Sequence, residues 1–151
     1  MTFKVFFDIC DRKSEEYLGR ITIQINEDMK LHPSVKNFIL LILGTEGRSY
    51  KRIILDYHCY LMGGLVTPVF VPSEGESRRV DRWETKRGDV YQMYPDHKDA
   101  RYSEFAITFN KLSIDSPKLG SVINLSDLDF LENVQSKNIL LRVFDCGIII
   151  E

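Results

Sequence analysis

The side chains able to carry out covalent or metal chemistry are few in this chain. Three cysteines and three histidines occur among its 151 residues. His58 and Cys59 are adjacent, but a zinc site needs three or four converging ligands, so we predict no metal site. His97 has no nucleophile motif beside it, which favours a solvated loop histidine over a catalytic base. The sequence therefore implies neither a metal nor a cofactor.

A group of side chains that could bind a ligand lies in the segment 78–87. It carries five basic and two acidic residues around Trp83, the only tryptophan of the chain. Cations beside an aromatic ring can bind phosphate and stack on a base. The two acidic residues dilute this charge, and the whole chain has a formal charge of −2. We therefore favour a solvated loop or a protein contact over nucleic-acid binding.

The composition is typical of a globular domain. Apolar residues make up 44% of the chain and charged residues 28%. The longest apolar run, 38–43, is far shorter than the roughly 18 residues that a membrane span requires. The N-terminus shows no secretion signal, and the widely spaced cysteines resemble reduced thiols. We expect one domain over residues 1–151, no membrane association, and a cytoplasmic or nuclear location.

Apolar residues that alternate with polar ones predict two strands near the start of the chain. The alternation covers 3–9 and 21–25, and the polar stretch 11–16 suits a turn between them. A helix is predicted from Pro33 to Gly44, because apolar residues recur there at helical spacing and both ends carry suitable residues. The other side of this helix is apolar too, so we expect both sides to be covered.

The rest of the chain is predicted to be mainly short strands. They lie within 52–71, 89–93, 105–109, 119–125, 139–144 and 148–150, and a short helix runs from Ser126, a cap-like residue, to about Val134. Helices do not alternate with strands, which argues against a doubly wound parallel sheet. A closed barrel hides the edges of antiparallel strands. We therefore predict an antiparallel barrel with two helices covering its ends.

Several short motifs occur in a recognisable order. They are Val5-Phe6-Phe7-Asp8-Ile9, Leu18-Gly19-Arg20-Ile21, Asn37-Phe38, Arg52-Ile53-Ile54, Gly63-Gly64 and Phe144-Asp145-Cys146-Gly147. In order and spacing they resemble the cyclophilin-type peptidyl-prolyl isomerases. The resemblance implies a mostly β fold, a closed eight-stranded antiparallel barrel capped by two α-helices. This agrees with the pattern of strands and helices.

The resemblance also implies a position for the chemistry. A prolyl isomerase lowers a rotation barrier of roughly 18–20 kcal/mol. It does so with an apolar pocket for the proline ring and a cation that favours the twisted amide. Arg52 falls on the family's catalytic arginine, and Tyr57 falls on its pocket phenylalanine. His58 takes the place of the pocket methionine.

Elsewhere the chain departs from the family pattern. Glu104 replaces a glutamine that supports the arginine, and a carboxylate beside Arg52 would occupy its guanidinium. Ala106 replaces a phenylalanine of the pocket floor, which removes apolar contact area of order 100 Å². In the groove segment Met93 is followed by Tyr94, whose ring would obstruct an extended peptide. Ile114 aligns loosely with the family's tryptophan.

Three functional interpretations follow from these residues. The leading one is a cyclophilin-like protein-interaction module with weak or no isomerase activity. Its partner would be a protein or peptide, including one that presents proline. The second is an active, divergent isomerase acting on Xaa-Pro bonds, which requires an open apolar pocket beside Arg52. The third is an unrelated β-barrel that binds a small apolar ligand in a deep internal cavity.

Overall fold

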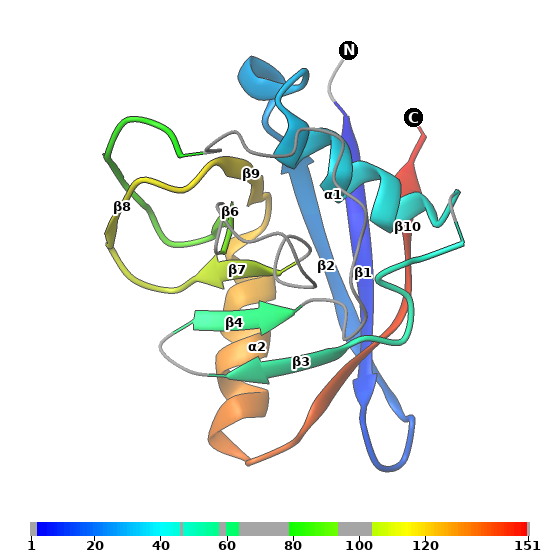
Figure 1. Ribbon diagram of the computed structural model, residues 1–151. Helices are drawn as coiled ribbons and strands as arrows, with labels where there is room; N and C mark the ends of the chain where they lie inside the picture. Colours follow the sequence, from blue (N-terminus) through cyan, green and yellow to red (C-terminus); the bar gives the residue numbers. More distant parts are fainter. Residues whose placement is uncertain (1–2, 46, 58–59, 64–78, 94–103, 151) are drawn as a thin grey trace.

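The first and last strands of the chain lie side by side, and this pairing is the start of a barrel (Figure 1). The computed structural model describes residues 3–45, 47–57, 60–63, 79–93 and 104–150. The barrel strands are β1 (Lys4–Asp11), β2 (Tyr17–Ile25), β3 (Ile54–Tyr57), β4 (Tyr60–Gly63), β6 (Asp89–Gln92), β7 (Phe105–Thr108), β9 (Lys118–Val122) and β10 (Leu141–Ile149). Their spatial order is β1-β10-β3-β4-β7-β6-β9-β2, closing on β1. The predicted eight-stranded antiparallel barrel is confirmed.

The remaining elements lie outside the barrel wall. Two short strands, β5 (Trp83–Glu84) and β8 (Ser113–Ile114), form a separate two-stranded sheet. A 3₁₀ turn, η1 (Glu27–Met29), follows β2. Figure 1 shows α1 (Pro33–Leu43) across the upper end of β1 and α2 (Leu125–Ser136) behind β3 and β4. No helix of the described ranges is both long and apolar enough to span a membrane.

Helix α1 begins and ends where the sequence predicts. Pro33 occupies its first turn, and Nδ1 of His32 accepts the backbone N–H of Ser34 at 3.1 Å. Gly44 ends the helix with φ of 69°, a left-handed conformation that costs glycine little. Leu40 and Leu43 are 38% and 44% exposed. The prediction that both sides of the helix are covered is therefore wrong for these two residues.

Two predicted boundaries differ from the structure. Helix α2 begins at Leu125 after Asn124, so Ser126 lies inside its first turn and is not its cap. Strand β10 runs without interruption from Leu141 to Ile149, where the sequence suggested two strands. Strand β10 has one extra residue, a β-bulge, opposite the Asp8–Ile9 step. Its pairing with β1 continues beyond the bulge through Cys146 and Gly147.

Four aromatic rings fill the barrel beneath α1. They belong to Phe7, Phe38, Tyr50 and Phe105, each no more than 2% exposed, and every pair of ring centres lies between 5.0 and 6.3 Å apart. The four residues come from β1, α1, the segment before β3, and β7. Edge-to-face and offset contacts at these spacings stabilise the core beyond area burial alone. This ring cluster therefore ties the helix to opposite walls of the barrel.

Candidate functional site

Arg52 lies in the turn that precedes β3. Its φ is 77°, in the left-handed region that few side-chain-bearing residues adopt. Its backbone N–H donates to the carbonyl of Val143 at 2.9 Å, which attaches the turn to β10. Its guanidinium forms an ion pair with Glu15 of the β1–β2 turn, and both side chains are about half exposed. The arginine is therefore held on the β10 side of β3.

Glu104 is not the carboxylate that pairs with Arg52. It directly precedes β7, and its backbone carbonyl accepts the N–H of Met93 at 2.9 Å. In the barrel order β4 lies between β7 and β3, and β10 lies on the other side of β3. Because the turn before β3 is bonded to β10, Arg52 extends towards Glu15. The predicted Arg52–Glu104 pair is replaced by this one.

Tyr57 lies at the end of β3 and packs against the main core of the barrel. Its hydroxyl donates to the backbone carbonyl of Leu131 in α2 at 2.6 Å. Burial raises the pKa of this phenol far above its usual range. Leu55, two residues before it, is also buried, while Asp56 between them is exposed. This alternation directs Tyr57 to the helix-covered side of the wall.

Met93, Ala106 and Ile114 do come together, on the outer side of the wall. Tyr91 and Ala106 are direct partners between β6 and β7. Tyr91, Met93 and Ala106 form a buried group, and Trp83 and Ile114 pack against it. We call these five residues the outer cluster. Ala106 is 0% exposed, Tyr91 6% and Met93 8%.

Trp83 and Tyr91 belong to the outer cluster, although the sequence places neither residue in the groove and assigns Trp83 to the basic segment. Trp83 pairs with Ile114 through the β5–β8 ladder, and its indole N–H donates to the carbonyl of Ser116 at 2.8 Å. Because the paired residues are about thirty positions apart in the chain, their pairing produces no local periodicity in the sequence. The predicted groove residues His58 and Tyr94 lie outside the described residues.

The basic segment has acidic or carbonyl partners for its described arginines. Arg79 pairs with Asp115 at 2.6 Å, and Arg82 donates to the carbonyl of Ser113 at 3.1 Å. Arg87 pairs with two carboxylates of α2, one of them Asp129 at 3.1 Å. The carboxylates compensate the positive charge of Arg79 and Arg87, which phosphate binding would require. Within the described ranges, no group of three His, Cys, Asp or Glu could hold a metal ion.

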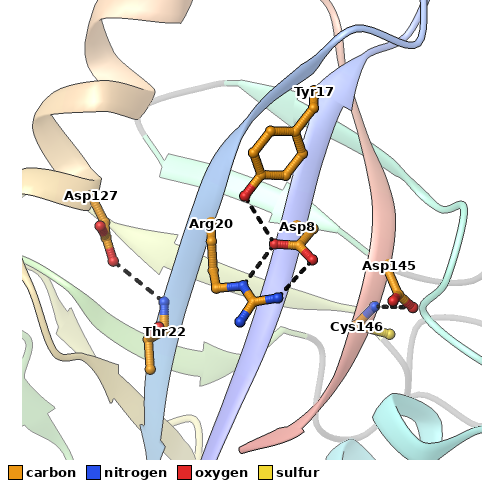
Figure 2. Close-up of polar contacts among 7 residues, drawn as sticks. All are labelled: Asp8, Tyr17, Arg20, Thr22, Asp127, Asp145 and Cys146. Atoms are coloured by element: carbon orange, nitrogen blue, oxygen red, sulfur yellow. Dashed lines mark hydrogen bonds and ion pairs between the residues drawn. The ribbon is translucent and has the colours of Figure 1, made fainter.

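A further polar group lies on β1 and β2 (Figure 2). Two nitrogens of the Arg20 guanidinium donate hydrogen bonds to the Asp8 carboxylate, at 2.8 and 3.0 Å. The Tyr17 hydroxyl donates to the same carboxylate at 3.2 Å. Asp8 is only 8% exposed, and the Arg20 guanidinium also lies 4.0 Å from the centre of the Phe6 ring. Hydrogen bonding to Asp8 raises the pKa of Arg20 further. The charges of Arg20 and Asp8 therefore balance each other without a partner from outside the chain.

Cys146 is not a poised nucleophile. Its sulfur lies 3.5 Å from the carbonyl oxygen of Ile42 in α1. Burial raises the pKa of this thiol to about 11. The thiolate that a nucleophile requires is therefore scarce at neutral pH. Burial also raises the pKa of Cys10, which is 0% exposed.

The structure is similar to one that is already solved. It matches the crystal structure of the Mimivirus cyclophilin with a TM-score of 0.64 and 18% sequence identity, over 99% of this chain and 90% of that chain. No protein-family model and no curated protein matches the chain. A likeness at this identity establishes the fold. The function has to be argued from the side chains.

Proposed function

We propose that this chain, a barrel of the cyclophilin type, serves as a protein-interaction module with weak or no prolyl isomerase activity. The observation that carries the proposal is the position of Arg52, which is bonded to β10 and paired with Glu15. An isomerase needs its cation beside the pocket that holds the proline ring. The outer cluster lies beyond β4 from Arg52, on β6 and β7.

The ion pair with Glu15 holds the Arg52 guanidinium only weakly. Both side chains are about half exposed, so their attraction is screened and contributes roughly 0–1 kcal/mol. The backbone hydrogen bond to Val143 and the left-handed conformation at Arg52 fix the start of the side chain more firmly. The position of the Arg52 backbone, more than the ion pair with Glu15, therefore keeps the guanidinium away from the outer cluster.

The burial of the outer cluster also opposes catalysis. Ala106 replaces the pocket phenylalanine of the family pattern and is 0% exposed. A proline ring could reach it only if a covering side chain moved. Such a displacement would cost buried apolar contacts and expose the ring of Tyr91 or Trp83 to water. The filled surface therefore suits contact with the outside of a partner better than insertion of a proline ring and catalysis on a twisted amide.

An isomerisation assay on a short Xaa-Pro peptide tests this proposal. We expect the purified chain to leave the cis-to-trans rate within about twofold of the uncatalysed rate. Arg52→Ala should give the same rate, as should the matched variant Arg82→Ala, whose arginine lies outside the barrel wall.

Turnover well above background in the wild type, lost in Arg52→Ala and retained in Arg82→Ala, would contradict the proposal. That outcome would establish the alternative, an active divergent isomerase acting on Xaa-Pro bonds. The partner we propose is a protein or peptide, including one that presents proline, and the compartment we propose is the cytoplasm or nucleus.

A further inference from the structure

An open groove of about 470 Å³ lies on the outside of the barrel, between η1 and the strands β2 and β9. Figure 1 shows β9 beside the upper end of β2, from which the chain continues into η1. Small-ligand pockets in proteins have volumes of roughly 300–1,000 Å³, so a side chain of a partner fits this space. We call it the β2–β9 groove. The lining side chains that decide its chemistry are Asn26, Glu27, Asp28, Lys118, Ser121 and Ile123.

The hydrogen-bond donors of the β2–β9 groove are used inside the chain. The Asn26 side-chain N–H donates to the backbone carbonyl of Lys118 at 3.0 Å, and the Ser121 hydroxyl donates to Asp89 at 3.2 Å. The Lys118 ammonium pairs with the same carboxylate at 3.2 Å. Asp89 is only 5% exposed, so it neutralises this cation from beneath the surface. Lys118 and Asp89 together therefore add no net charge to the groove.

The carboxylates of the groove remain available to a ligand. Glu27 and Asp28 are adjacent in η1, and neither forms an ion pair with a described residue. One oxygen of Glu27 accepts the backbone N–H of Phe3 at 3.1 Å, which holds this half-buried side chain and leaves its second oxygen. Asp28 is exposed. The two side chains thus offer acceptors without a compensating cation.

This balance of donors and acceptors selects a cationic ligand. A guanidinium has five N–H donors and no acceptor, and it binds carboxylate oxygens through several of them at once. Lys4 faces Gln24 across the β1–β2 ladder but does not line the groove. Ile123 is 41% exposed and offers apolar surface beside the carboxylates. An arginine next to an apolar residue complements both parts of the lining, whereas the carboxylates would repel a nucleic acid.

The groove adjoins the outer cluster. Lys118, which lines the groove, pairs with Tyr91 in the β6–β9 ladder. Its ammonium lies 5.9 Å from the centre of the Trp83 ring. Tyr91 and Trp83 both belong to the outer cluster. Because neighbouring strands are only about 4.8 Å apart, a partner that rests on the outer cluster can extend into the groove.

We propose that the β2–β9 groove binds an arginine side chain of a partner protein, with the guanidinium on Glu27 and Asp28 and a neighbouring apolar side chain against Ile123. The inference rests on the proposed role as an interaction module. It names the chemistry of the partner and extends the contact surface from the outer cluster to η1.

The test uses a blocked Leu-Arg-Leu peptide and a counterpart with citrulline in place of arginine. Citrulline keeps the shape of arginine and loses its charge. Each peptide is titrated into the isotope-labelled full chain while the backbone amide of Ser121 and the side-chain amide of Asn26 are observed by NMR. We expect saturable shifts with the arginine peptide at up to about 10 mM, and about tenfold weaker binding of the citrulline peptide.

Substitutions in η1 should act through the same charges. Glu27→Gln and Asp28→Asn should each weaken binding of the arginine peptide by about twofold to fivefold, as expected for partly exposed ion pairs, and the double variant by about tenfold. Asp56→Asn is the matched control, because it removes an exposed carboxylate from β3, a strand outside the groove, and it should bind like the wild type. Amide spectra that overlay away from η1 and β9 show that the variants are folded.

Equal binding of the two peptides, unchanged binding by the double variant, or an equal loss in Asp56→Asn would overturn the inference. Isomerase turnover together with binding that depends on Glu27 and Asp28 would refute only the proposed function. Absent turnover together with absent binding of the arginine peptide would refute only the site in the β2–β9 groove.

Discussion

Phe105→Ala is expected to lower the free energy of unfolding by about 3–5 kcal/mol. Phe105 contacts all three other rings of the core, with ring centres 5.0 Å from Tyr50, 5.4 Å from Phe7 and 5.5 Å from Phe38. Its removal leaves a cavity between two barrel walls and α1 that rigid neighbours cannot fill. Urea titration monitored by circular dichroism measures the change.

Phe144→Ala is the control for this substitution. Phe144 is 44% exposed, so the same chemical change should cost less than about 1 kcal/mol. If Phe105→Ala abolishes folding, Phe105→Leu keeps the prediction measurable, with an intermediate loss expected. Equal losses at positions 105 and 144 would show that the ring cluster is not the centre of stability.

Gly120→Ala is expected to destabilise the barrel by about 3 kcal/mol. A methyl group on Gly120 would lie 2.4 Å from the backbone carbonyl oxygen of Gln24 and 2.9 Å from a side-chain carbon of Ile23. The backbone of Gln24 is part of a strand and cannot move aside as a flexible side chain can. The β2–β9 ladder pairs only Ile23, Gln24 and Ile25 of β2, so a clash there disturbs a ladder of only three residue pairs. Thermal unfolding of the variant measures the loss.

Gly19→Ala provides a graded comparison. Its added methyl group would meet only the ring of Phe130, at 3.2 Å, and that side chain can rotate or shift by a few tenths of an ångström. We expect less than half the cost of Gly120→Ala. If Gly120→Ala leaves the melting temperature unchanged, the close approach of β9 to β2 is not as tight as described.

The barrel could be predicted because its signals are local. Val5, Phe7 and Ile9 alternate with more exposed residues, and this period-two pattern requires one buried face. Pro33 and Gly44 mark the ends of α1 through backbone geometry that few other residues supply. Strand β10 was divided in the prediction because a bulge interrupts its alternation without ending its pairing.

The site could be predicted only in part, because its geometry depends on long-range pairing. Sequence alignment with the family pattern marked Arg52, but its conformation depends on a hydrogen bond to Val143, some ninety residues later. The filling of the outer cluster by Trp83 depends on the β5–β8 ladder, which has only two residue pairs. No composition or periodicity encodes such contacts.

The central claim is that side chains of this chain occupy the place where a proline ring would bind. The most direct measurement is a titration of protein carrying labelled alanine, methionine and isoleucine methyl groups with an Ala-Pro peptide. We predict that the methyl signals of Ala106, Met93 and Ile114 stay in place up to about 10 mM peptide, a concentration that would reveal even weak binding. Saturable movement of the Ala106 methyl signal, with cis and trans peptide signals exchanging in the same sample, would contradict the account.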